Sequence, residues 1–255
     1  MLHISFMNIK ILKKIIGIFG FKLVEKKLFK NNRLLSNYSF LSTKKILTEL
    51  FNQKKINSIV QIGANDGVRF DELDGFINEH KIQSLLVEPI KSNFEKLKTK
   101  YYDVDFVKLE NSAILINEQV SYLYKVDNKH LIHYDKHVPG ITSFNKNHLL
   151  KHGVKEKHII KEKVNSINIK ELLNKYNIKN LDLFYIDAEG YDGKIVIDFL
   201  MNTNLKPIII FEYIHIDNET FNTLLLKLNE ANYKIFSINE NIFCIPSSSK
   251  ISITL

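Results

Sequence analysis

The sequence predicts an α/β protein built on a doubly wound, mostly parallel β-sheet, which ends in an antiparallel hairpin and is preceded by N-terminal helices. Three observations support this prediction. Apolar strand-like runs alternate with amphipathic helix-like segments through most of the 255 residues. The strand runs are continuously apolar, which is typical of parallel strands buried on both faces. The last two runs, residues 233–238 and 242–245, are separated by a turn too short for a parallel crossover.

The expected elements follow one another in a regular order. Helices are expected where apolar residues recur at helical spacing: 42–53, 70–80, 90–102, 169–176, 192–201 and a segment that Asp217 can cap. Strands are expected at short apolar runs: 58–62, 83–87, 104–109, two within 112–126, 181–187, 207–213, 233–238 and 242–245. Two residue pairs, Ser92 with Glu95 and Asn168 with Glu171, have the spacing of a capping box, so each predicts a helix start.

Residues 127–163 break this alternation and show no regular period. We interpret them as an inserted lid or substrate segment, with Pro139 and Gly140 as a candidate hinge. Six histidines fall in this segment: His130, His133, His137, His148, His152 and His158. Their spacing fits no standard metal-ligand pattern, so a solvated lid is favoured over a zinc site.

Composition favours one domain with attachments. With 45% hydrophobic and 11% aromatic residues, the chain can bury one sizeable core. We therefore assign residues 56–255 to a single domain and residues 1–55 to a helical extension. Cys244 is the only cysteine, which excludes a disulfide framework and fits a cytoplasmic location. The net charge of +8 comes from dispersed lysines, so no nucleic-acid partner is expected.

Residues 9–29 carry basic and apolar residues at helical spacing. The longest uncharged run, residues 15–21, is too short to span a membrane, and no convincing signal-peptide cleavage site follows it. Two interpretations remain open. The helix can dock on the domain, or it can lie on an anionic membrane surface and make a peripheral contact at the inner face of the membrane.

Two of the nine glycines stand at the end of the first predicted strand, in the segment GANDG. Glycine permits a positive φ and lets a ligand approach the backbone. Gly63 ends the strand and Gly67 lies near the following helix. The segment lacks the GxGxxG pattern of dinucleotide sites and the lysine of a P-loop, so it is not an obvious pyrophosphate site.

Acidic residues follow the other predicted strands at the same edge of the sheet. Glu88 comes after the second strand, where doubly wound folds hold an acid that accepts hydrogen bonds from ribose hydroxyls. This position predicts a nucleoside ligand. Asp187 ends a later strand in FYIDAEGYD, and Glu212 and His215 end the next. Because the carboxyl ends of parallel strands share one edge, these side chains are expected to face a single crevice.

Seven segments together resemble the FkbM-type S-adenosylmethionine-dependent methyltransferases. They are VQIGANDG, LLVEPIKSNFEKL, ENSAIL, GITSF, VNSINIKELLNKY, LDLFYIDAEGYD and IIIFEY, and they occur in family order over roughly residues 56 to 246. The resemblance implies a Rossmann-like class I methyltransferase fold. It also implies methyl transfer to a hydroxyl group, most often of a sugar, a surface glycan or a secondary metabolite.

The resemblance also implies roles for individual residues. The cofactor would be bound by Gln61, Gly63, Ala64, Asn65, Asp66, Gly67, Glu88, Ser112, Ala113 and Asp187. The substrate side would contain Thr142, Ser143 and Glu212. Gln61 departs from the family pattern, because many members carry aspartate at this position.

An alcohol that accepts a methyl group must lose its proton, so the site needs a general base. The candidates are Asp187, Glu189 and His215, and an acid from the IDAEG segment is favoured. A divalent metal held by Asp187, Glu189, Glu212 and His215 is conceivable but not predicted. Two alternatives stay open: an RNA methyltransferase, and a non-catalytic scaffold at a membrane that retains the fold.

Overall fold

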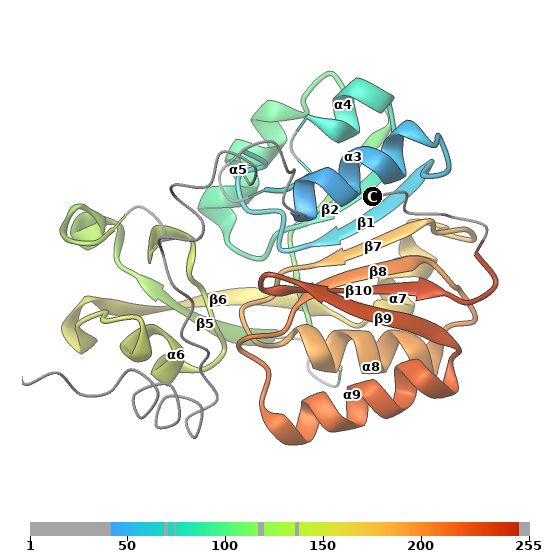
Figure 1. Ribbon diagram of the computed structural model, residues 1–255. Coiled ribbons are helices and arrows are strands. Elements are labelled where there is room, and N and C mark those ends of the chain that lie inside the picture. The colour runs from blue at the N-terminus through green and yellow to red at the C-terminus, as the bar shows by residue number, and fades with distance from the viewer. Residues whose placement is uncertain (1–41, 69–70, 74, 117–119, 136–137, 250–255) are drawn as a thin grey trace, which may run out of the picture. The chain divides into compact units, whose positions relative to one another are not determined.

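A computed structural model describes residues 42–68, 71–73, 75–116, 120–135 and 138–249 (Figure 1). Its centre is a seven-stranded sheet in the order β3-β2-β1-β7-β8-β10-β9. The strands are β1 (Ser58–Ile62), β2 (Gln83–Val87), β3 (Val107–Glu110), β7 (Leu183–Ile186), β8 (Ile208–Glu212), β9 (Tyr233–Ile238) and β10 (Asn241–Pro246). The predicted fold class is confirmed.

The order of the strands places the ligand crevice. The first five strands run parallel, and β10 pairs antiparallel with both β8 and β9. The chain moves outward from β1 to β3 on one side and resumes at β7 on the other, so the order reverses between β1 and β7. In doubly wound sheets this reversal opens a crevice at the carboxyl ends of the strands.

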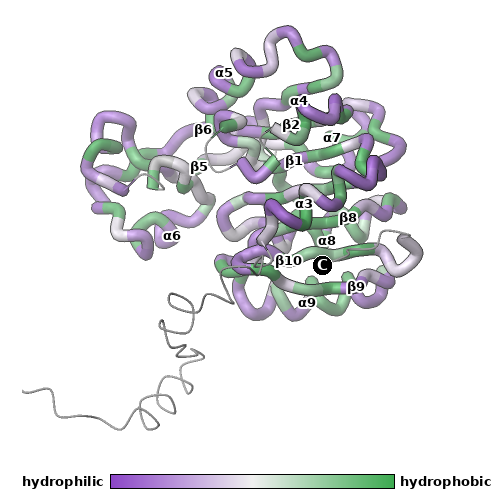
Figure 2. The backbone as a smooth tube through the Cα atoms, turned by 45° about the horizontal axis from the view of Figure 1, so that its top comes forward, coloured by the Kyte–Doolittle hydropathy of each residue, from purple (hydrophilic) through white to green (hydrophobic). Residues whose placement is uncertain are grey.

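Helices cover both faces of this sheet (Figure 1). One face packs against α3 (Thr43–Asn52), α4 (Phe76–His80) and α5 (Lys91–Lys100), and the other against α7 (Ile169–Lys175), α8 (Asp192–Asn202) and α9 (Asn218–Glu230). Side chains of one strand alternate between the two cores, because Ile59 packs with α3 and Val60 packs with α8. In Figure 2 the hydrophobic stretches follow the strands of the sheet.

Three helix starts agree with the sequence analysis. Ser42 caps α3, Asp217 caps α9, and Asn168 with Glu171 forms the predicted capping box of α7. A capping box satisfies two backbone N–H groups that the first turn leaves without helical partners.

The predicted helix 90–102 begins as expected, but the capping box of Ser92 with Glu95 was predicted wrongly. The N-cap is Ile90 and makes no side-chain cap, while Ser92 and Glu95 lie inside the helix. The carbonyl of Ile90 accepts hydrogen bonds from the N–H groups of Asn93 and Phe94, which sets the helix start before Ser92 can cap it. Helix α4 is also shorter than the predicted 70–80, because it begins at Phe76 after Gly75 with φ of 88°.

The inserted segment contains regular structure that the sequence analysis missed, and it pairs with the two strands that were expected within residues 112–126. A three-stranded sheet joins β4 (Ala113–Ile114), β6 (Ile159–Ile167) and β5 (Val120–Val126) in that order. The first half of β6 lies within residues 127–163 and pairs antiparallel with β5. Its sequence IIKEKVNSI mixes charged and apolar residues because one face is exposed, so it lacks an apolar run. The segment also carries α6 (Lys146–Lys151) and three short 3₁₀ turns.

The predicted division between an extension at residues 1–55 and the main domain stays a prediction, because only residues 42–55 of that extension are described. Helix α3 belongs to the compact unit Leu41–Leu255, and Ile46, Leu47, Leu50 and Phe51 are buried in its core. Residues 9–29 lie outside the described residues. Among the described helices, none is long and apolar enough to cross a membrane.

Candidate active site

A cavity of about 690 Å³ opens at the carboxyl ends of β1, β2, β7 and β8. Its volume falls within the range of roughly 300–1,000 Å³ that is usual for small-molecule sites. Ten of the predicted residues line it: Gly63, Asn65, Glu88, Ser112, Ala113, Thr142, Asp187, Glu189, Glu212 and His215. Five do not: Gln61, Ala64, Asp66, Gly67 and Ser143. Most of the predicted residues therefore border one cavity, while the role of each residue stays a prediction.

Position 63 requires a glycine, because the end of β7 lies close to the end of β1 there. Its φ is 82°, and a Cβ atom built on it would lie 1.9 Å from the carbonyl oxygen of Asp187. The end of β7 therefore fills the space that a side chain would need. The sequence analysis attributed this glycine to close approach of a ligand, but the closest approach is that of the protein backbone. Gly67 packs in the same way, against the Leu97 side chain of α5.

Glu88 is buried and connects the glycine segment to the end of β2. One carboxylate oxygen accepts a hydrogen bond of 2.9 Å from the N–H of Asn65, and the other accepts one of 2.9 Å from the N–H of Ile90. Burial raises the pKa of Glu88 to about 7, although these hydrogen bonds act in the opposite direction. The Asn93 side chain donates a third hydrogen bond to this carboxylate, so about one of its four lone pairs is left for a ribose hydroxyl.

The wall after β3 holds a second buried acid. Ser112 Oγ donates a hydrogen bond of 2.6 Å to Glu110 Oε1, while Lys175 Nζ and Tyr176 OH lie 2.6 and 2.7 Å from Oε2. Burial acts to raise the pKa of Glu110, but these donors outweigh it and lower the pKa. Ser112 is thereby fixed in orientation where it lines the cavity.

Asp187 and Glu212 form an acidic floor between β7 and β8. Burial and the neighbouring carboxylates, Glu189 first among them, raise the pKa of Asp187 well above its ordinary value. Burial, together with Glu189 and Asp192, raises the pKa of Glu212 to about 8. Like charges that are packed in a site of low polarity disfavour simultaneous ionisation. This floor can therefore take up protons or bind cationic groups.

The turn after β7 is held in a constrained shape. Asp192 is fully buried at the start of α8, and its carboxylate accepts hydrogen bonds of 3.1 Å from the N–H groups of Ala188 and Gly190. Glu189 has φ of 49°, a left-handed conformation that is uncommon outside glycine. Gly190 lets the backbone of His215 approach, since a Cβ there would lie 3.1 Å from the His215 carbonyl oxygen. The turn therefore presents Glu189 to the cavity beside His215.

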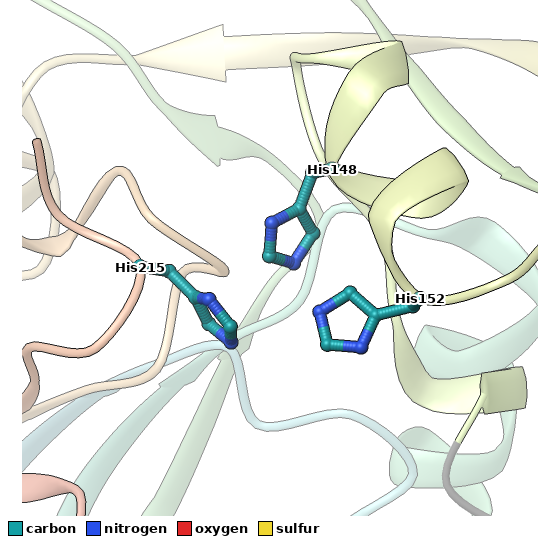
Figure 3. Close-up of side chains that lie close together, drawn as sticks. All are labelled: His148, His152 and His215. Carbon is teal, nitrogen blue, oxygen red and sulfur yellow. The ribbon is translucent and has the colours of Figure 1, made fainter. Parts of the chain in front are cut away.

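Three histidines meet at the outer edge of the acidic floor (Figure 3). His148 and His152 come from α6 and its C-cap, and His215 follows β8. His148 Nε2 lies 3.1 Å from Glu189 Oε2, and His215 Nε2 lies 3.8 Å from Glu212 Oε2. Burial and His148 lower the pKa of His215. Of the four residues named for a metal, Glu189, Glu212 and His215 converge, whereas Asp187 is not part of that group.

Several site residues were missed by the sequence analysis. Asp71 and Glu72 line the cavity, and the buried Gln61 donates from Nε2 to Asp71 Oδ1 at 2.9 Å. Tyr185 OH donates to Glu72 Oε2 at 2.8 Å, where burial raises the pKa of Glu72. The only sequence signal for Asp71 and Glu72 was that residues 70–80 begin with acidic residues. The sequence analysis assigned these residues to a helix by their periodicity and did not consider them for the site.

The comparisons with solved structures found proteins of low sequence identity. An FkbM methyltransferase from Methylobacillus flagellatus KT is 12% identical, with 74% of this chain and 44% of that chain covered and a TM-score of 0.43. The SAH-bound methyltransferase PaMTH1 from Podospora anserina is 11% identical, with 96% and 99% covered and a TM-score of 0.44. An O-methyltransferase from Bacillus cereus in complex with SAH is 8% identical, with 92% and 97% covered and a TM-score of 0.43.

The family comparison gives a direct assignment. No curated protein matches the chain. The family described as the methyltransferase FkbM domain matches residues 61–235, which is more than half of the chain and includes the glycine segment, Glu88 and the acidic floor. The chain therefore belongs to the FkbM family of S-adenosylmethionine-dependent methyltransferases.

Proposed function

We propose that this protein is an O-methyltransferase that methylates a hydroxyl group of a sugar or surface glycan. The observation that carries this proposal is the acidic floor, where Asp187, Glu189 and Glu212 border the same cavity as Gly63 and Glu88. A proton acceptor therefore lies beside the predicted donor site, as transfer to an alcohol requires.

The donor half of the cavity, the side that carries Glu88, Ser112 and Ala113, fits S-adenosylmethionine. Glu88 retains a lone pair for a ribose hydroxyl, and Ser112 and Ala113 line the wall where the adenine is expected. When bound, the cofactor supplies an electrophilic methyl group on a positively charged sulfur. The acidic floor favours this cation, because Asp187 and Glu212 are partly buried, so water screens their ionised forms less than at the surface.

Asp187 is the favoured general base. Once ionised, a carboxylate with a raised pKa accepts a proton from an alcohol more readily than an ordinary carboxylate does, and Asp187 lines the cavity. Glu189 and His215 stand at the same rim and remain the other candidates. The protein's further tasks are to align the acceptor oxygen and to exclude water.

Two features of the acceptor half support a sugar. Carboxylates accept hydrogen bonds from neighbouring hydroxyl groups, and Glu189 and Glu212 offer several lone pairs at the rim. Phe144 and Tyr191, packed edge to face with ring centroids 5.2 Å apart, also line the cavity. They provide an apolar wall for the C–H face of a ring. Thr142 lies beside them and can add a polar contact.

Transfer of a radiolabelled methyl group to separated cell fractions tests this proposal. Label should enter the glycan fraction, and Asp187→Asn should lower the rate by about 10²–10⁴-fold while binding of S-adenosylhomocysteine stays within a few-fold. Asp198→Asn is the matched control, since Asp198 lies on α8, bonds to Asn202 and does not line the cavity.

The same experiment separates the alternatives. Label in RNA would replace the proposal with an RNA methyltransferase. A non-catalytic scaffold predicts no transfer to any fraction and no difference between the wild type and Asp187→Asn. Mass spectrometry of glycans from cells with and without the gene provides an independent test, because each lost methyl group removes one methylene mass.

A further inference from the structure

The favoured route of the proposed transfer, with Asp187 as the base, does not use the cluster of His148, His152 and His215. His152 and His215 line the mouth of the cavity, and all three side chains are only partly exposed. Figure 3 shows the rings turned toward one another, two from the α6 side and one from the loop after β8. This arrangement joins the inserted segment to the rim of the main sheet.

The spacing of the three rings is close to that of a metal site. One ligand nitrogen from each residue can be chosen so that all lie within 4.8 Å of one another. Three nitrogens that bind one zinc ion tetrahedrally at about 2.0–2.1 Å lie roughly 3.4 Å apart. Side-chain rotations that shorten the separations by about 1.4 Å or less would therefore complete the coordination.

Local structure supports the convergence of the rings. The N–H of His152 donates to the carbonyl oxygens of His148 and Leu149, so the last turn of α6 keeps both histidines on one side. His215 reaches them because Gly190 lets its backbone approach the turn after β7. Edge-to-face ring packing contributes as well, with centroids of His148 and His215 4.4 Å apart. Ring packing alone does not require the nitrogen atoms to converge.

Metal-binding histidines usually donate a hydrogen bond to a carboxylate that orients the ring, and His148 has such a neighbour. His148 Nε2 lies 3.1 Å from Glu189 Oε2, with side chains 10% and 23% exposed. If Nε2 carries the proton, this hydrogen bond leaves Nδ1 of His148 as the ligand atom. Ser143 Oγ donates to the carbonyl oxygen of Glu189 at 3.3 Å, which ties this residue to the inserted segment.

We propose that His148, His152 and His215 bind one borderline divalent transition-metal ion, such as Zn²⁺, at the mouth of the cavity. Three imidazoles suit zinc, and a site with three protein ligands keeps an open fourth position. The ion would fasten α6 to the loop after β8 and so close one side of the cavity. Glu189 acts as the positioning residue for His148. This site differs from the carboxylate-rich group that the sequence analysis considered without predicting it, because two of its ligands come from the insertion.

Titration calorimetry with Zn²⁺ on the chelator-treated full chain tests the proposal, together with the absorption spectrum after Co²⁺ is added. We expect one saturable site per chain and the intense visible bands of tetrahedral cobalt. Each of His148→Gln and His152→Gln should weaken zinc binding by at least about tenfold, and Glu189→Gln by about 10- to 100-fold. Zinc should raise the thermal midpoint of the wild type and not that of His148→Gln.

His133→Gln is the matched control, because His133 lies in the same insertion but contacts the separate group of His130 and His158. It should bind zinc as the wild type does. Circular dichroism and thermal unfolding without metal would establish that each variant is folded. Absence of a saturable site in the wild type would overturn the proposal. Undiminished binding by both His148→Gln and His152→Gln would do so too, because the ion would then be held by Glu189, Glu212 and His215.

Discussion

The two halves of the rim hold their acids in different ways. On the side of β2 and β3, Glu88 and Glu110 each accept hydrogen bonds at both carboxylate oxygens. On the side of β7 and β8, burial raises the pKa of Asp187 and Glu212, and nearby acids raise it further. The first half holds its carboxylates in fixed positions. In the second half neighbouring acids raise the pKa in the same direction as burial, whereas the hydrogen bonds to Glu88 and Glu110 oppose burial.

This difference indicates which half binds and which half reacts. A carboxylate that is already oriented by backbone N–H groups needs little reorganisation when it accepts a ligand's hydroxyl groups. A carboxylate that lies beside other carboxylates is stabilised more by a proton or a cation, so it is suited to proton transfer. The boundary between the halves runs through Gly63, where β1 and β7 meet.

The largest effect is expected where the two halves touch. Gly63→Ala places a methyl group 1.9 Å from the Asp187 carbonyl oxygen, in a backbone with φ of 82°. The strands must separate to admit it, so we expect the free energy of unfolding to fall by at least about 3 kcal/mol. Urea denaturation of the purified protein measures this loss.

Gly75→Ala provides the control for Gly63→Ala, because Gly75 has φ of 88° and nothing within 4 Å of a built Cβ. Its cost should reflect backbone strain alone, about 1–2 kcal/mol. Equal losses for the two variants would contradict the role assigned to the contact between Gly63 and Asp187.

The next effect concerns pH and the donor half. The pKa of Glu88 is about 7 in the free protein, so the carboxylate ionises as the pH rises through neutrality. Ribose hydroxyls donate to the ionised form and stabilise it, which means that binding should release a proton. The affinity for S-adenosylhomocysteine should therefore be about tenfold higher at about pH 8 than at about pH 6. Calorimetry in two buffers of different ionisation enthalpy would measure both the affinity and the proton release.

Glu88→Gln isolates this contribution from the acids of the other half. Its affinity should be lower than that of the wild type, and the part of the pH dependence due to Glu88 should vanish. A variant that keeps the full tenfold rise would show that the titrating group lies elsewhere, with Glu212 and its pKa of about 8 as the nearest alternative.

The sequence allowed the sheet, most helices and the rim to be predicted, because each depends on local patterns. Continuous apolar runs marked β1 and β8, and Asn168 with Glu171 marked α7. Strand β6 was not predicted, because its exposed face carries Lys161 and Lys163 and it therefore has no continuous apolar run.

The missed site residues depend on contacts between distant parts of the chain. His148 meets Glu189 and His215 only through the docking of α6 beside the rim, and their separation in sequence conceals this. Asp71 likewise becomes a site residue through its bond with Gln61. Side chains brought together by packing cannot be recognised from periodicity, which reports only the face on which each residue lies.

The smallest expected effect tests the fixed half of the rim. Ser112→Ala removes the donor to Glu110 Oε1 and leaves a buried acceptor without that bond, which should cost about 1 kcal/mol of stability. Lys175→Met removes a donor to Oε2, but the lysine side chain is 54% exposed and Tyr176 still bonds to that oxygen, so its loss should be smaller. Urea denaturation of both variants shows which of them loses more free energy of unfolding. A larger loss for Lys175→Met would mean that the exposed ion pair, and not the buried hydrogen bond of Ser112, fixes Glu110 in this half.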